Sequence, residues 1–123
     1  MQYIFLLYRD ERWREALGEK EVAEVQREYI ELHRELIERG VFVAGAPLRP
    51  TETATTVRVR NEEKVVTDGP FAETKEQLGG YYLIDVESLD EALEWAGRIP
   101  SARSGSVEVR PVEPINVPAE AGR

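Results

Sequence analysis

Two stretches of the chain are apolar on both of their alternating faces, which is typical of strands in the middle of a sheet. The first is residues 2–8, which are rich in β-branched and aromatic side chains, and the second is residues 80–86. One face of the first strand carries Ile4 and Leu6, and the other carries Tyr3, Phe5 and Leu7. The pattern therefore predicts two central strands that are far apart in the sequence.

Two helices are predicted by apolar side chains that recur at spacings of three and four. Residues 19–39 form the longer helix, which Gly40 ends. Ser88 begins the shorter helix in a capping box with Glu91, and Pro100 ends it. The apolar stripe of the longer helix is Val22, Val25, Tyr29, Leu32 and Leu36. The stripe of the shorter helix is Leu89, Ala92, Leu93 and Ala96.

The other apolar segments predict strands at residues 41–47, 55–60, 64–68 and 106–110. The two middle segments flank three polar residues and should form a hairpin. The side chains expected to face the core are Val57 and Val59 in the hairpin and Val107 and Val109 in the last strand.

The order of the elements is strand, helix, strand with hairpin, strand, helix and strand. This is the ferredoxin-like split βαβ arrangement of the α+β class, with an inserted hairpin. Its first and third main strands are central, which is where the two doubly apolar strands fall. We expect residues 1–112 to form a single domain. Residues 113–123, which include Pro114 and Pro118, should be an extended or disordered tail.

Two helices can cover only one face of a four-stranded sheet. The uncovered face carries either Phe5 and Leu7 or their alternates Ile4 and Leu6. An apolar patch of this kind is unusual in water. The sequence therefore predicts a homodimer that packs sheet against sheet. The alternative is a monomer whose tail or hairpin covers the face.

Composition narrows the classes of partner. The 123 residues carry a formal charge of −8, which disfavours nucleic acids and anionic membrane surfaces. With no Cys and a single His, only carboxylates are left for a metal, and no EF-hand spacing is present. No nucleotide-binding glycine motif occurs, so no cofactor is expected. The apolar start is too short for a signal core or a membrane span, and we expect a cytoplasmic protein.

Residues 68–80, DGPFAETKEQLGG, place a Gly-Pro turn and several charges directly before a central strand. Loops in such positions often carry sites. Asp68 either stabilises its own turn or acts as a catalytic carboxylate at the mouth of a cleft. Phe71 is expected in the core, with a place in a ligand pocket as the alternative. Glu73 and Lys75 are ligand-binding candidates, and solvated ion pairs within the loop are the alternative.

His33 is the only histidine and the candidate general base. On a helix it falls inside an apolar arc that runs from Leu32 through Tyr29 to Ile30, so we expect it to be largely buried. A buried imidazole either acts as an acid or base near neutral pH or is a core side chain held by one hydrogen bond. Arg58 is a further candidate, either for an anionic ligand or as part of a solvated strand face.

The tract at residues 68–80, with its lead-in at 53–59 and the segments 81–86 and 89–92, resembles the YCII-related family, specifically the branch with the DGPF motif. The resemblance covers the chain from Met1 to Val112 and implies a dimeric α+β barrel of ferredoxin-like subunits. Most members of that family have no assigned reaction, and many are encoded beside extracytoplasmic-function sigma factors. A few relatives in the wider superfamily act on small aromatic or chlorinated molecules.

The wider family is associated with a His–Asp pair that is proposed to act as an acid–base dyad. Tyr29 occupies the His position in this chain, and His33 lies one turn later. The resemblance favours a protein that binds a small organic molecule; cofactor-independent acid–base catalysis would use His33 and Asp68. The alternative is a non-catalytic regulatory or interaction protein linked to a sigma-factor system. A heme-handling or monooxygenase-like barrel is a third interpretation, from analogy of fold alone.

Overall fold

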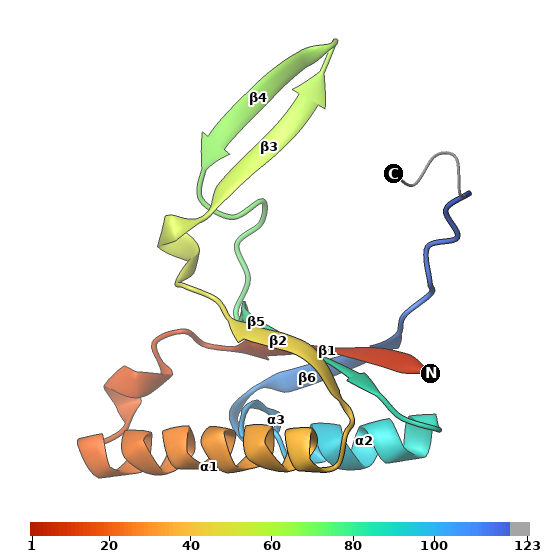
Figure 1. Ribbon diagram of the computed structural model, residues 1–123. Coiled ribbons are helices and arrows are strands. Elements are labelled where there is room, and N and C mark those ends of the chain that lie inside the picture. Colours follow the sequence, from red (N-terminus) through yellow and green to blue (C-terminus); the bar gives the residue numbers. More distant parts are fainter. Residues whose placement is uncertain (119–123) are drawn as a thin grey trace.

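The main sheet has four antiparallel strands, with helices on one face and a two-stranded hairpin standing off the other (Figure 1). The computed structural model describes residues 1–118. The strands of the main sheet lie in the order β2-β5-β1-β6. The elements are β1 Gln2–Arg9, η1 Trp13–Ala16, α1 Glu19–Glu38, β2 Phe42–Pro47, η2 Thr51–Thr53, β3 Thr55–Arg60, β4 Glu63–Asp68, β5 Gln77–Asp85, α2 Leu89–Gly97, α3 Ser101–Ser104 and β6 Ser106–Pro111.

The two strands that are apolar on both faces, β1 and β5, are the central pair of the sheet. They run antiparallel, with Phe5 opposite Tyr82. The outer strands β6 and β2 pair with the other edges of β1 and β5. A register shift at Gly79 leaves Leu7 opposite Gly80 and Tyr8 opposite Leu78. The predicted α+β class and ferredoxin-like order of elements are confirmed.

The core lies between the helices and one face of the sheet. Tyr3, Phe5 and Leu7 of β1 point toward the helices and are buried. Leu32 and Leu36 of α1 pack in the same cluster, as the predicted stripe requires. The other buried members are Ile84, Val86, Ala92, Trp95, Ala96 and Ile99, and Val107 and Val109 pack against them as predicted.

The predicted end of α1 and the predicted start of α2 are supported by their local geometry. The predicted end of the second helix at Pro100 differs, because α2 ends at Gly97 and Pro100 precedes the short helix α3. Gly40 follows α1 with a φ of +71°, a conformation that favours glycine. The N–H of Val41 then donates to the carbonyl of Leu36 at 3.1 Å, which closes the last turn. At the start of α2, Ser88 Oγ accepts a hydrogen bond of 3.2 Å from the N–H of Glu91.

The buried stripe of α2 differs from the predicted one. Leu89 and Leu93 are exposed, whereas Trp95 is buried with Ala92 and Ala96. Trp95 removes far more apolar surface from water than either leucine would, because its side chain is larger. The small alanines on either side let the helix lie close enough to the sheet for the indole to fit. The stripe is therefore rotated toward Trp95.

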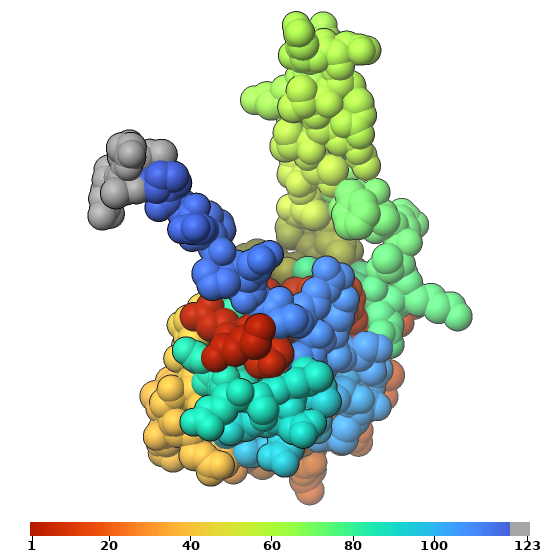
Figure 2. All heavy atoms as spheres, turned by 90° about the vertical axis from the view of Figure 1, so that its right-hand side faces the viewer, coloured from red at the N-terminus to blue at the C-terminus, as the bar shows by residue number. Residues whose placement is uncertain are grey.

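The face of the sheet away from the helices has no helix over it in the described part of the chain. Its half-buried side chains include Ile4 and Leu6 of β1 and Tyr81 and Leu83 of β5. The hairpin and the chain that follows β6 both rise on this side (Figure 1). Figure 2 shows them as two separate projections with space between them. We call this surface the open face.

The hairpin β3–β4 corrects one expectation. Val57 and Val59 were expected to face the core, but they are 57% and 63% exposed. Alternation along the strand correctly predicts that they share a face. It does not reveal whether anything covers that face, and the hairpin stands away from the sheet (Figure 1).

The predicted tail is described only in part. Residues 113–118 follow β6 without a helix or strand. The remainder of the predicted tail, residues 119–123, lies outside the described residues.

Candidate functional site

His33 lies on α1, but its side chain is exposed, so its expected burial is wrong. The apolar arc that enclosed it relied on Ile30, which is itself exposed. The buried stripe is narrower and contains Leu32 and Leu36, so at about 100° per residue His33 falls on its flank. There the imidazole meets the ring of Phe42 edge-on, with centroids 4.8 Å apart and planes at 78°.

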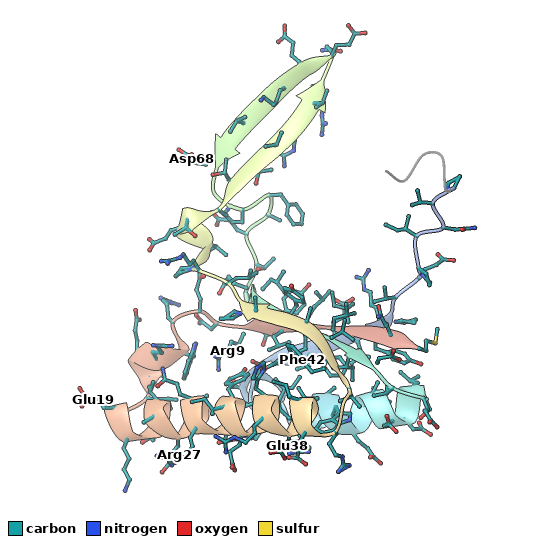
Figure 3. The ribbon with its side chains drawn as sticks, in the orientation of Figure 1. Arg9, Glu19, Arg27, Glu38, Phe42 and Asp68 are labelled. Carbon is teal, nitrogen blue, oxygen red and sulfur yellow. The ribbon has the colours of Figure 1, made fainter. Side chains whose placement is uncertain are left out.

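Asp68 ends β4 at the base of the hairpin and is exposed. Figure 3 shows it on the opposite side of the main sheet from α1, while Phe42, the aromatic neighbour of His33, lies on the sheet itself. Within one chain the structure therefore does not bring His33 and Asp68 together. The turn after Asp68 is formed as the sequence suggests, with Gly69 at a φ of +96°.

The other predicted site residues lie on the hairpin or on the segment that returns from it to β5. Phe71 is 79% exposed, so its expected place in the core is wrong. Glu73 and Lys75 are exposed, and Arg58 is half-buried. Within residues 1–118 none of these three charges forms an ion pair. The hairpin and the return segment that carry them rise on the side of the open face, away from α1, which carries His33 (Figure 1).

A group of side chains that the sequence analysis missed lies at the end of β1, between the sheet and α1. Arg9 points between the sheet and α1 (Figure 3). Its guanidinium carbon lies 3.8 Å from the centroid of the Trp13 ring and 5.7 Å from that of Tyr29. Such contacts are cation–π interactions. No carboxylate pairs with Arg9 among the described residues.

Two tyrosines and a serine complete this group. The hydroxyls of Tyr29 and Ser101 share a short hydrogen bond of 2.5 Å. Tyr82 lies on β5, and burial, with the nearby Tyr29 acting in the same direction, raises its pKa to about 12. We call Arg9, Trp13, Tyr29, Tyr82 and Ser101 the Arg9 cluster.

The electrostatics of the Arg9 cluster follow from partial burial. Removal from water lowers the pKa of Arg9 from its usual value, while the Tyr29 phenol raises it and Arg14 lowers it. A guanidinium stays protonated near neutral pH all the same, because its ordinary pKa is so high. The raised pKa of Tyr82 keeps its phenol protonated as well. The cluster therefore presents one cation and the neutral phenol of Tyr82.

Two glycines allow the cluster to assemble. A Cβ at Gly105 would lie 2.1 Å from the carbonyl oxygen of Tyr8 and 2.7 Å from the Cβ of Arg9. A Cβ at Gly45 would lie 2.8 Å from a ring carbon of Tyr82. Only glycine lets the backbone approach so closely at these two points.

Part of the Arg9 cluster had a signal in the sequence. Arg9 continues the inward alternation of Tyr3, Phe5 and Leu7, so its position on the helix side of β1 followed from the strand period. Tyr29 was already on the predicted stripe of α1. Ser101 had no such signal, because the four-residue helix α3 that carries it shows no usable period.

Another group of arginines is arranged differently. A surface cleft of about 300 Å³ between the end of α1 and α2 is lined by Arg39, Arg98 and Trp95, together with two glutamates. Arg98 is paired with Glu35, which raises the pKa of the arginine. The cleft is lined by two arginines and two glutamates, so the charges of its lining balance. None of the predicted site residues lines this cleft.

The described residues show two further absences. In residues 1–118 no group of three or more His, Cys, Asp or Glu side chains could hold a metal ion. Over the same range no helix is long and apolar enough to cross a membrane.

Comparison with known proteins identifies the family. The model of the YCII-related domain matches residues 1–116. The chain belongs to the YCII-related family. A relative from Rhizobium meliloti, described as uncharacterised, is 46% identical over 114 residues, covering 91% of this chain and 92% of the relative. The family match spans the sheet, the helices, the hairpin and every member of the Arg9 cluster.

Proposed function

We propose that this YCII-related protein binds a small organic anion at the Arg9 cluster and works as a homodimer. The observation that carries the binding proposal is the half-buried guanidinium of Arg9, which has aromatic neighbours but no carboxylate within residues 1–118. Charged groups that leave water are normally paired. An anionic ligand would supply the missing partner.

The neighbours of Arg9 restrict the shape of that ligand. Guanidinium binds carboxylates through two parallel hydrogen bonds. The rings of Trp13, Tyr29 and Tyr82 add apolar surface, and the protonated phenol of Tyr82 adds a neutral donor. A small carboxylate with an aromatic or flat body matches both features. The indole of Trp13 stacks on the guanidinium of Arg9, so a ligand that reaches Arg9 would have to move this side chain and the short η1 segment that carries it.

The same cluster bears on catalysis. Arg9 is a cation and burial raises the pKa of Tyr82 to about 12, so neither of these two members offers a general base near neutral pH. The candidate base His33 touches the cluster only indirectly, because it contacts Phe42, whose ring centroid is 6.4 Å from that of Tyr82. This donor-rich chemistry supports binding more strongly than acid–base turnover. It also suits the second candidate function, a non-catalytic regulatory protein linked to a sigma-factor system.

Benzoate is expected to bind the protein and change the fluorescence of Trp13. The chain has two tryptophans, so the titration uses a Trp95→Phe background, in which Trp13 is the only one left. Arg9→Met keeps the aliphatic stem but removes the charge, and should weaken binding about tenfold or more, because hydrogen bonds to charged groups contribute about 1.5–3 kcal/mol. Arg34→Met, on an exposed arginine of α1, is the matched control.

Acetate and inorganic phosphate complete the set of probes. Unchanged Trp13 fluorescence with all three anions, or equal affinity in the Arg9→Met and Arg34→Met variants, would reject the Arg9 cluster as an anion site. Proton NMR of benzoate and of its hydroxylated analogues after long incubation separates the two functions. Recovery of the ligands unchanged supports a binding role, and conversion supports an enzyme.

The dimer proposal rests on the open face. Phe5 and Leu7 were possible contact residues in the sequence analysis, but both are buried against the helices, so Leu6 is the informative position. Light scattering at micromolar concentration should give about twice the chain mass of 14.0 kDa. Leu6→Glu should give a folded monomer, because it puts a charge at the centre of the interface. Leu93→Glu, on the exposed side of α2, should stay dimeric.

Two finer assignments belong to the same proposal. One is membership of the DGPF-motif branch of the family, which the tract at residues 68–80 supports. A cytoplasmic location is consistent with the absence of cysteine from the whole chain. Fractionation of cells that express a tagged full-length protein would test the location.

A further inference from the structure

The hairpin β3–β4 is a separate two-stranded sheet that pairs only with itself among the described strands. Every residue of β4 is exposed. Isolated two-stranded hairpins are marginally stable in water at best. An arm of this kind gains stability when a surface from elsewhere covers it. We call residues 55–68 the arm.

One face of the arm is apolar. Val57 pairs across the hairpin with Val66, so both lie on the same face, and Val59 follows two residues after Val57. Val66 is 56% exposed, similar to the other two valines. The opposite face carries Arg58 paired with Val65. Valines in such numbers on one uncovered strand face indicate a surface that is buried in some assembly.

The arm is fixed at its base. The carboxylate of Glu11 accepts hydrogen bonds from the N–H and the hydroxyl of Thr51, at 2.9 and 2.6 Å. These bonds tie the 3₁₀ turn before the arm to the segment after β1. The two chains at the base are joined by a bond of 2.7 Å from the N–H of Gly69 to the carbonyl of Ala54. The arm is therefore held in a definite direction, on the side of the open face (Figures 1 and 2).

The size of the open face bears on what covers it. Four strands about 4.8 Å apart, with six to nine residues at about 3.3 Å each, give a flat area of roughly 450 Å². A stable interface buries about 800 Å² on each partner. One face of the arm adds roughly 200 Å², estimated with the same spacings from its six-residue strands. A second copy that uses both surfaces comes close to the required size.

Charge is compatible with a second copy as the partner. The chain carries a net charge of −8, so two bodies repel each other. The arm itself carries three basic and three acidic side chains. Lys64 pairs across the hairpin with Val59, so it lies on the apolar face, and within residues 1–118 it forms no ion pair. This cation is free to meet a carboxylate of an acidic partner.

We propose that the arm clasps the second subunit, with the face that carries Val57, Val59 and Val66 against it. This proposal rests on the proposed dimer and adds an interface element outside the sheet. The arm and the open face then form one continuous contact surface, and each subunit contributes an arm to the other.

The test removes the arm and keeps the hydrogen bonds of Thr51 with Glu11 and of Gly69 with Ala54 at its base. Replacement of residues 56–67 by Asn-Gly joins Thr55 to Asp68, which face each other across the hairpin, through a two-residue turn of a favoured type. Circular dichroism and a thermal melt report whether the body stays folded. Sedimentation over a range of concentrations then gives the dimer dissociation constant, which should rise at least tenfold relative to the parent.

Point variants keep the result interpretable if the shortened chain fails to fold. Val57→Thr combined with Val66→Thr keeps the β-branched shape but makes the apolar face polar, and it should also weaken the dimer at least tenfold. Val65→Thr, on the other face of the arm, should leave the dissociation constant within about twofold, since surface substitutions are usually near neutral.

The outcomes separate the two proposals. A parent protein that is monomeric at micromolar concentration rejects the sheet-face dimer and the arm contact together. If Leu6→Glu dissociates the dimer while loss of the arm and the double valine variant leave its dissociation constant unchanged, only the arm contact is rejected. Equal weakening by Val65→Thr would reject the assignment of the contact face.

Discussion

Leu36→Ala is expected to lower the free energy of unfolding by about 2–5 kcal/mol, the range for large-to-small changes at well-packed core positions. Leu36 is 1% exposed and lies on α1 among the buried residues that join the helix to the sheet. The substitution removes apolar burial and leaves a cavity in the cluster that holds the C-terminal half of α1 against the sheet. Urea denaturation monitored by circular dichroism measures the change.

Ile37 provides the matched control for Leu36. It is the next residue on the same helix and is 54% exposed. Ile37→Ala should change stability by about 1 kcal/mol or less, because little apolar surface is lost and alanine favours the helix. A loss of less than about 1 kcal/mol for Leu36→Ala would mean that α1 packs through a different face.

Gly105→Ala is expected to destabilise the protein by about 2 kcal/mol or more, because an added methyl group has no room. The new Cβ would lie 2.1 Å from the carbonyl oxygen of Tyr8, which belongs to the backbone of a central strand. Strand β1 or the turn before β6 must move to relieve the overlap. Because the same methyl group would touch Arg9, binding of benzoate should weaken in parallel.

The same substitution at Gly97 should have the opposite sign. Gly97 ends α2, and a Cβ there would meet nothing within 4 Å. Alanine reduces the entropy of the unfolded chain, so Gly97→Ala should be neutral or stabilising by about 0.4–1 kcal/mol. Equal effects at the two positions, measured by urea denaturation, would show that steric overlap does not decide the result at Gly105.

The central position of β1 and β5 could be predicted from the apolar pattern of their own residues. A strand with Phe5 on one face and Leu6 on the other is apolar on both sides, which is typical of a strand with neighbours on both edges. The ends of the helices were predictable for a local reason. Gly40 and Ser88 satisfy backbone groups within a few residues of themselves.

The positions of His33, Phe71 and Val57 could not be predicted in the same way. Each is apolar or amphipathic and lies in a periodic or motif-rich segment, so each reads as a core residue. Their exposure depends on which distant segment reaches them, and the periodicity of one element contains no such information. The Arg9 cluster shows the converse, because its members come from five elements or segments and meet only after the sheet and helices pack.

The junction between Ala54 and Gly69 has a consequence for how the chain can change over time. A hydrogen bond joins the backbones of Ala54 and Gly69, so the residues between them form a loop whose two ends lie side by side. Its length can vary without altering the register of β2 or β5, since loop length has only a slow effect on stability. Insertions, deletions and substitutions can therefore occur in this segment of a relative independently of the sheet. The surface that this segment presents is free to diverge while the sheet and the Arg9 cluster stay constant.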